Sequence, residues 1–330
     1  MDWLTQQHQH QQQQQQYKAM TISTDNKTVY NDIRLGVIGG TGLYQLEGYE
    51  KVDEVQPETP WGQSASPIKI LRTPRGHHIA FLARHGLNHE FSPSEVPYTA
   101  NIAALKSIGV QAIVAFSAVG SLQEIIKPGD FVLPNQIIDR TKGIRKDSFF
   151  GNGVIAHASF GEPFHKPLKE LIYSHRDSVP EITIHKDKVA VSMEGPAFST
   201  RAESNLYRSW GGDIINMTCI PEAKLAREAE IAYQLVCMST DYDAWRESEE
   251  PVTVAEVMKT MTTNAVRAKA LLFSILPDLE DKLYTGDKDS IELVKDIRGT
   301  MALAFQQPKD GRAKEKCQTL AYIFPGYFTL

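Results

Sequence analysis

The chain has 330 residues, of which 42% are hydrophobic and 23% are charged, and its formal net charge is −5. This composition is ordinary for a globular protein, and the negative charge argues against the basic surface that a nucleic-acid-binding protein needs. No apolar run reaches transmembrane length and no basic-then-apolar leader opens the chain, so we expect neither a membrane span nor secretion.

The two ends of the chain differ from the region between them. Residues 6–16 are all glutamine apart from His8 and His10, and few large apolar side chains are available there to offset the entropy of ordering. We therefore predict a disordered Gln-rich N-terminal tail over residues 1–31, a single domain over 32–307 and a C-terminal extension of unknown role over 308–330. The two histidines could bind a metal, but a solvated tail is the favoured interpretation.

The first predicted strand covers residues 33–38 and ends in Gly39-Gly40-Thr41-Gly42. A glycine-rich turn after a strand lets backbone N–H groups approach an anion, and Thr41 adds a hydroxyl. A plain tight turn is an equally good interpretation. The dinucleotide-binding pattern Gly-x-Gly-x-x-Gly is not met in register.

A second polar strand end follows two short strands predicted over residues 68–73 and 78–82. Arg84 and His85 come directly after the second of these strands, and His89 follows within one turn. The planar guanidinium suits phosphate, and the imidazole can donate to an oxyanion. The alternative is an Arg-His pair on the surface.

A third strand end is made of small residues. The pattern predicts a helix over residues 98–108 and a strand over 112–116, which ends in Ser117-Ala118-Val119-Gly120. Small residues there let backbone amides and the Ser117 hydroxyl point at a ligand. A strand is predicted over 131–133, and residues 140–164, which carry His157, are predicted to be loop.

The next part of the chain pairs an aromatic residue with a helix start. A helix is predicted over 167–175 and a strand over 188–192, and Thr200 with Glu203 forms a capping box that begins a helix ending at Trp210. Phe198 and Ser199 lie just ahead of that helix. Phe198 could stack on a flat ring, although an aromatic at such a place is more often a core anchor.

The last strand ends combine donors with acids. Residues 213–218 are predicted to be a strand that ends in Asn216, Met217 and Thr218, followed by a helix over 221–230. The apolar run over 231–238 predicts a strand covered on both faces, and Asp241 and Asp243 follow it. Ligands of α/β sheets bind outside the carboxyl ends of strands, where a carboxylate can exchange a proton with a bound ring.

Two further helices are predicted beyond this acidic strand end. Thr253 and Glu256 form a second capping box, and the apolar spacing predicts a helix over about 254–272. Another helix is predicted over about 290–304. Cys219, Cys237 and Cys317 form no Cys-x-x-Cys pair, so we expect reduced thiols, no metal site and a cytoplasmic location, with the nucleus as a second location.

Taken together, four strand ends offer donors and a fifth offers acids. A phosphate pocket beside a carboxylic acid suits phosphorolysis of a glycosyl bond, in which phosphate attacks and the acid protonates the leaving base. The sequence at 39–43, 83–86, 194–199, 216–218 and 240–243 resembles the 5′-methylthioadenosine phosphorylases of the purine nucleoside phosphorylase family. The resemblance covers residues 33–305 in the same order.

The resemblance implies an α/β fold with three α/β/α layers, in which a mixed, twisted, partly closed barrel-like sheet is flanked by helices. It implies reversible phosphorolysis of S-methyl-5′-thioadenosine in methionine and purine salvage, with inorganic phosphate as co-substrate and no cofactor. The partners would be a small-molecule nucleoside and phosphate, and the assembly a homotrimer in which each site is completed by the next subunit.

Roles for single residues follow from the same resemblance. Phosphate would be held by six residues: Thr41, Arg84, His85, Ser117, Ala118 and Thr218. Asn216 and Met217 would contact the nucleoside, Phe198 would pack on the purine, and Asp241 and Asp243 would be the catalytic pair at N6 and N7. Ser199 would help set substrate choice, and Val254 would line the methylthio slot. His89, and His157 of a neighbouring subunit, would lie near the 5′ end.

Two other functions stay open on the sequence. One is a phosphorylase for ordinary purine nucleosides such as adenosine, inosine or guanosine. The other is a non-catalytic nucleotide-binding module built on the glycine turn at 39–42, which requires an acidic ribose ligand about 20 residues further on. Glu58 is of that type, but it sits in a proline-flanked loop and not after a strand.

Overall fold

The computed structural model describes residues 30–43, 46, 48–246, 254–287, 289–306 and 313–328. The predicted N-terminal tail up to residue 29 and the Thr253 capping residue therefore lie outside the described residues. The side chain of Val254 does so too, since only the backbone of residues 254–257 is described.

Within the described part of the chain, nine strands form one mixed sheet in the order β2-β3-β4-β1-β5-β8-β7-β6-β9. β9 pairs in parallel with β5 and antiparallel with β6, so β5, β8, β7, β6 and β9 close into a ring. This ring confirms the predicted mixed, partly closed sheet. The strand bounds are β1 (Leu35–Gly39), β2 (Glu50–Val55), β3 (Ile68–Arg72), β4 (His78–Ala83), β5 (Ala112–Ser121), β6 (Phe131–Arg140), β7 (Ile184–Met193), β8 (Ile214–Asn216) and β9 (Ala232–Asp241).

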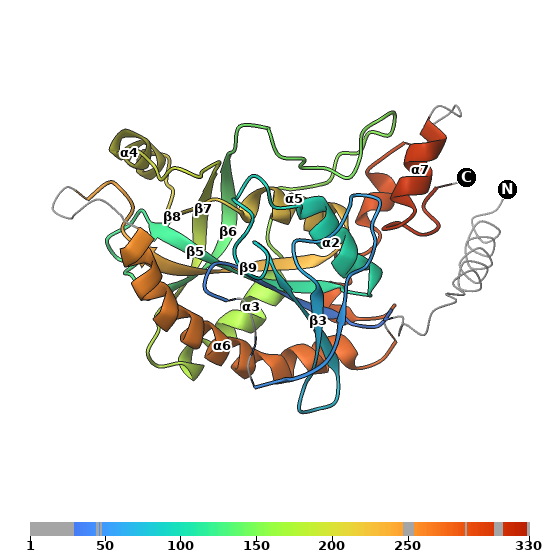
Figure 1. Ribbon diagram of the computed structural model, residues 1–330, viewed down its shortest axis with the longest axis horizontal. Helices are drawn as coiled ribbons and strands as arrows, with labels where there is room; N and C mark the ends of the chain where they lie inside the picture. Colours follow the sequence, from blue (N-terminus) through green and yellow to red (C-terminus); the bar gives the residue numbers. More distant parts are fainter. Residues whose placement is uncertain are drawn as a thin grey trace.

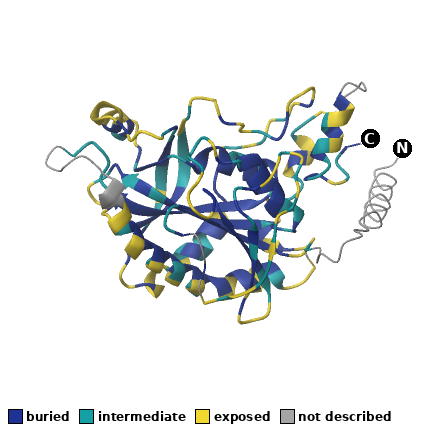
Figure 2. Cartoon of the chain, viewed as in Figure 1, coloured by how far each residue is buried: buried dark blue, intermediate teal, exposed yellow. Residues whose placement is uncertain are grey.

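Helices cover both faces of this sheet, which confirms the predicted three layers (Figure 1). Residues of α2, α5 and α7 share one buried apolar cluster, and residues of α3 and α6 share the other. The central strands are buried, while the outer faces of the helices and most of α4 are exposed (Figure 2). The helix bounds are α2 (Tyr98–Ser107), α3 (Lys166–Ser174), α4 (Arg201–Ser209), α5 (Cys219–Glu228), α6 (Val254–Tyr284) and α7 (Lys314–Leu320), with short 3-10 turns η1 (Arg176–Ser178), η2 (Glu292–Val294) and η3 (Thr300–Leu303).

Most of the predicted elements are present, with boundaries that differ by a few residues. The helix starting at the Thr200 capping box is confirmed, with both reciprocal hydrogen bonds formed. The strands predicted over 131–133 and 188–192 are longer, because β6 and β7 pair along most of their length. The helix predicted to end near 272 continues through Pro277 to Tyr284.

The prediction of one helix over 290–304 is wrong. Gly299 has a φ of 75° and separates η2 from η3, so the segment forms two short 3-10 turns instead. β2 and α7 were not predicted. β2 carries mostly charged residues because it is an exposed edge strand, and such a sequence does not show the apolar pattern of a buried strand.

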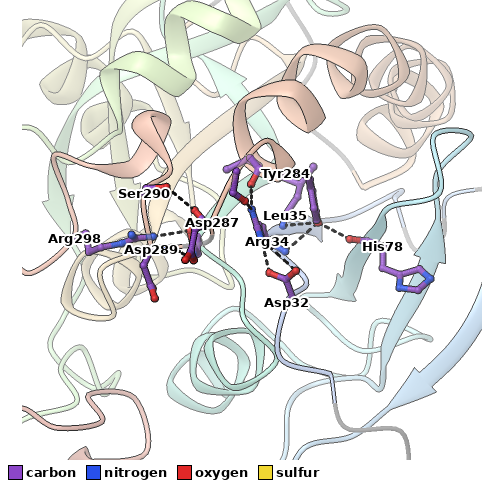
Figure 3. Close-up of polar contacts among 12 residues, drawn as sticks. Asp32, Arg34, Leu35, His78, Tyr284, Asp287, Asp289, Ser290 and Arg298 are labelled. Carbon is purple, nitrogen blue, oxygen red and sulfur yellow. Dashed lines mark hydrogen bonds and ion pairs between the residues drawn. The ribbon is translucent and has the colours of Figure 1, made fainter. Parts of the chain in front are cut away.

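The far end of α6 is fixed to the amino end of β1 (Figure 3). The Tyr284 hydroxyl accepts from the backbone N–H groups of Arg34 and Leu35 at 3.0 and 3.3 Å, and it donates to the His78 carbonyl. The buried Arg34 guanidinium donates to the Leu283 carbonyl at 2.8 Å. These contacts hold the long helix against the sheet, and its other end reaches the carboxyl ends of the strands.

The described part of the C-terminal extension packs on the domain. Leu320 and Phe324 belong to the same apolar cluster as α2 and α5. The Tyr327 hydroxyl donates to Oε2 of Glu230 at 2.9 Å, and Glu230 also accepts from the backbone of η3. Among the helices of the described ranges, none combines the length and the apolarity that crossing a membrane requires.

Candidate active site

A cavity of about 690 Å³ opens at the carboxyl ends of the central strands. Its walls come from the last residues of β5, β7, β8 and β9, from the segments that follow β1, β4, β7, β8 and β9, and from α6. All five polar strand ends of the sequence therefore meet at one place. The predicted site residues that line the cavity are Thr41, Arg84, His85, His89, Ser117, Ala118, Phe198, Asn216, Met217, Thr218, Asp241 and Asp243.

Two predicted site residues, Ser199 and His157, do not line the cavity. Ser199 is buried beside it, with its Oγ 3.4 Å from the sulfur of Met193. His157 is exposed on another part of the surface, which agrees with an expected role in a neighbouring subunit and does not test it. The side chain of Val254 lies outside the described residues. Met258, one turn further along α6, lines the cavity.

Arg84 is a fully buried cation in the cavity wall, with 1% of its side chain exposed. It donates from Nε and Nη2 to both oxygens of Glu222 at 2.7 Å, and from Nη1 to the Phe116 carbonyl at 2.8 Å. The Tyr233 hydroxyl donates to the same carboxylate. A Cβ on Gly40 would lie 2.7 Å from Nη1, so this glycine of the predicted anion turn makes room for the guanidinium.

Glu222 is the residue of this region that sequence reasoning missed. The sequence placed it at the start of the helix predicted over 221–230, next to a motif of the family resemblance, and gave it no role at the site. The described contacts of Arg84 use three of the five N–H groups that a guanidinium has. The ion pair neutralises the arginine charge, so an anion would be held mainly by the remaining N–H groups and by hydroxyls and backbone dipoles.

His85 is fixed in one tautomer. Its Nδ1 lies 2.8 Å from the Phe91 carbonyl, and because a carbonyl only accepts, Nδ1 carries the hydrogen. Burial, and then the charge of Arg84, lower the pKa of His85 to about 4. At neutral pH the ring is therefore neutral, and its Nε2 is an acceptor. Nε2 would accept a hydrogen bond from the hydroxyl of a protonated phosphate. The expectation that His85 donates to an oxyanion is not met by this neutral form.

The acidic end of the cavity contains two carboxylates in different situations. The Asp241 oxygens accept from the Thr240 hydroxyl at 2.6 Å and from the Asp243 backbone N–H at 2.8 Å. These bonds hold Asp243 in the left-handed region, with a φ of 52°, which costs free energy for a residue with a Cβ. Gly120 faces this turn, and a Cβ there would lie 3.1 Å from Asp241 Oδ1.

Asp243 has a pKa well above that of an ordinary aspartate. Burial raises its pKa from 3.8 to about 6, and the charge of Asp241 adds to the effect while the Ser204 and Ser199 hydroxyls oppose it. Its Oδ2 is buried and has no hydrogen-bond partner among the described residues, and the same is true of Asn216 Nδ2. Both atoms belong to residues that line the cavity, so a bound ligand would supply their partners.

The rest of the wall is apolar. Met193, Met217, Met258 and Phe198 also line the cavity. Phe198 is 45% exposed and so stands at the mouth, where a flat ligand could cover it. The cavity wall thus combines hydrogen-bond donors, apolar side chains and carboxylates.

Comparisons with known proteins agree with this arrangement. The sequence profile of the Phosphorylase superfamily matches residues 34–277. The chain is 54% identical over 303 residues to S-methyl-5'-thioadenosine phosphorylase 1 of Puccinia graminis f. sp. tritici, which covers 89% of this chain and 98% of that one. It is also 54% identical, over 299 residues, to the S-methyl-5'-thioadenosine phosphorylase of Schizosaccharomyces pombe, covering 89% and 96%.

Solved structures resemble the whole fold. A methylthioadenosine phosphorylase from an antarctic soil metagenomic library superposes with a TM-score of 0.80 at 38% identity, covering 90% of this chain and 100% of that one. The methylthioadenosine phosphorylase of Schistosoma mansoni in complex with adenine gives a TM-score of 0.76 at 30% identity, covering 83% and 99%.

Proposed function

Because this chain belongs to the S-methyl-5'-thioadenosine phosphorylases of the phosphorylase superfamily, we propose that it catalyses the reversible phosphorolysis of S-methyl-5'-thioadenosine. Phosphate displaces adenine from C1′ of the sugar and yields 5-methylthioribose 1-phosphate. The protein is then a pentosyltransferase of methionine and purine salvage. Phosphate is a co-substrate, and no metal or organic cofactor takes part.

The observation that carries this proposal is the division of one cavity between donors and an acid. The donors Arg84, Ser117 and Thr218 line this cavity, and so does Asp243, whose Oδ2 has no partner among the described residues. A glycosyl phosphorolysis needs an anion site and a proton donor on opposite sides of a sugar. A cavity of about 690 Å³ is within the usual range for a nucleoside-sized ligand.

The chemical steps follow from these positions. The bond between C1′ and N9 breaks and its electron pair goes to the base, while a phosphate oxygen forms the new bond to C1′ from the opposite face. Asp243 gives its proton to N7, so adenine leaves as a neutral molecule. Thr41, Ser117 and the backbone at Ala118 complete the phosphate cradle, and Asn216 and Met217 hold the ribose.

The acidic end also supports the choice of base. A carboxylate accepts hydrogen bonds, and the 6-amino group of adenine donates one, so Asp241 and Asp243 suit a 6-aminopurine. A 6-oxopurine would place an acceptor against an acceptor, and a buried polar group left unpaired discriminates strongly. This favours adenine nucleosides over inosine or guanosine.

The surface around His157 supports a homotrimer. Ala156 forms a β-bridge with Phe305, and the backbone N–H of His157 donates to the Ala304 carbonyl at 2.9 Å. Leu303, next to Ala304 in the chain, is 95% exposed, and burial of this apolar side chain in a neighbouring subunit would be favourable. We infer that this surface completes the 5′ slot of that neighbour, beside its His89, in a cytoplasmic or nuclear enzyme that binds no nucleic acid.

The test is release of adenine from S-methyl-5'-thioadenosine by the purified protein, with and without inorganic phosphate. Adenosine and inosine are run side by side. We expect release that requires phosphate, with inosine the poorest substrate by at least a hundredfold in kcat/KM. Release that does not depend on phosphate, or a preference for inosine, would contradict the proposal.

A further inference from the structure

A buried ion pair behind the cavity wall connects the loops that form it. Arg145 and Glu194 have side chains that are 3% and 6% exposed, and Nε of the arginine lies 2.6 Å from Oε1 of the glutamate. Neither residue lines the cavity. Glu194 opens the segment 194–199 that the sequence analysis singled out, and the proposed reaction gives this glutamate no role.

Arg145 directs most of its donors to main-chain carbonyls of the cavity wall. Nη1 donates to the carbonyl of Met217 at 2.5 Å and to that of Ile220 at 2.7 Å, and Nη2 donates to the carbonyl of Glu194. The planar guanidinium can reach these acceptors at the same time because its N–H groups diverge in fixed directions. One side chain therefore holds the segments that follow β7 and β8.

Glu194 extends the connection to a third segment. Its Oε1 accepts from the Ser94 hydroxyl at 2.7 Å, and its Oε2 accepts from the backbone N–H of Lys142 at 2.5 Å. Ser94 belongs to the loop after β4, whose neighbours Pro93 and Glu95 line the cavity. Although burial alone would raise the pKa of Glu194, these hydrogen bonds and the charge of Arg145 hold it below its ordinary value.

Holding the carbonyls of Met217 and Glu194 also fixes the direction of the N–H groups that follow them. A peptide unit is planar and trans, so a carbonyl that points to Arg145 turns the N–H of the next residue the opposite way. The Met217 carbonyl fixes the N–H of Thr218, and the Glu194 carbonyl fixes that of Gly195. The two segments also touch, since a Cβ on Gly195 would lie 2.5 Å from the Met217 sulfur.

We propose that Arg145 and Glu194 are positioning residues that hold the ribose-side and base-side walls of the cavity in one arrangement. The expected loss of activity rests on the proposed function, whereas the expected loosening of the two segments does not. Without the pair, each segment keeps its own local structure, and the relative placement of Met217 and Thr218 against the 194–199 segment is lost. Substrate binding and turnover then both suffer, although no group that touches substrate has changed.

The test uses Arg145→Lys and Glu194→Gln, singly and together. Lysine keeps the charge but cannot reach three carbonyls, and glutamine presents a donor to the arginine. Arg227→Lys is the matched control, because Arg227 also donates to a loop carbonyl, that of Glu162, away from the cavity. Amide hydrogen exchange is measured on the unliganded proteins, and kcat/KM for S-methyl-5'-thioadenosine at saturating phosphate.

We expect faster exchange over 194–199 and 216–220 in both single variants and not in the control. We also expect at least a tenfold loss of kcat/KM in each single variant, and a double variant no worse than the poorer single one, since the pair acts as a unit. Unchanged exchange in these segments would overturn the inference whatever the activity. An inactive wild-type protein would overturn the proposed function alone, since the exchange result stands without substrate.

Discussion

Replacing Asp243 with asparagine should stabilise the folded protein at neutral pH while it removes the proposed acid. Burial raises the pKa of this carboxyl from 3.8 to about 6, so the folded state opposes its ionisation. Each pKa unit corresponds to about 1.4 kcal/mol, and the ionised side chain therefore costs about 3 kcal/mol above pH 6. Asparagine has nearly the same shape and never ionises.

The sign of the pH dependence follows from proton binding. Between pH 3.8 and 6 the folded state holds a proton on Asp243 that the unfolded state has lost, so stability falls as the pH rises through this range. The penalty is absent below the unfolded pKa and complete above the folded one. The advantage of Asp243→Asn should then be about 1 kcal/mol near pH 4.5 and at most about 3 kcal/mol near pH 8.

Thermal melts of both proteins at equal concentration, without phosphate, measure this difference. At about 2 °C for each kcal/mol, we expect the variant to melt a few degrees above the wild type near pH 8 and much closer to it near pH 4.5. Asp139→Asn is the matched control, because Lys224 and Thr141 hold the pKa of Asp139 below its ordinary value despite partial burial, so that variant should lose stability. A lower melting temperature for Asp243→Asn at both pH values would refute the reasoning.

Four other outcomes are expected. Glu222→Gln leaves a buried arginine without its counter-charge, so it should lower stability by about 3 kcal/mol, and added phosphate should recover part of the melting temperature. Tyr327→Phe removes one hydrogen bond from the C-terminal extension and should cost about 1 kcal/mol in a denaturant titration. A pH–rate profile of kcat/KM should fall as the pH rises through about 6, since Asp243 must hold its proton; a flat profile would count against it as the acid. Mixed refolding of Asp243→Asn with His157→Ala should restore activity, because some sites then receive both intact residues; no recovery would argue against shared sites.

The sequence predicted where chemistry would gather because the relevant signals are local. A strand that ends in glycine, hydroxyl or acidic residues is visible in a few consecutive positions, and the fold brings such ends to one edge of the sheet. The segments at 39–42, 84–85, 117–120, 216–218 and 241–243 all line one cavity for that reason. The boundaries of β6 and β7 were less predictable, since their length depends on pairing with each other.

The features that could not be predicted from the sequence depend on contacts between residues that are far apart in the chain. Glu222 follows the Asn216 strand end in sequence, but its partner Arg84 is 138 residues away, and no local pattern connects them. Arg145 lies in a segment that was predicted only to be loop. Its partners are main-chain carbonyl groups, and because every residue has one, the sequence gives no sign of which carbonyls it binds. The break at Gly299 was visible as a glycine, yet its effect on the predicted helix over 290–304 required the left-handed φ.

The arrangement of satisfied and unsatisfied groups explains how this cavity could select its ligand. Arg84 and Asp241 already have strong protein partners, whereas Asp243 Oδ2 and Asn216 Nδ2 have none among the described residues. A buried polar atom without a partner costs about 1–3 kcal/mol, and a ligand that supplies the partner recovers that free energy. With a pKa of about 6, Asp243 is mostly ionised at neutral pH in the empty cavity, so its Oδ2 can accept a hydrogen bond from a ligand. A bound nucleoside excludes water and raises this pKa further, so proton uptake should accompany substrate binding, and the acid is formed when its base is in place.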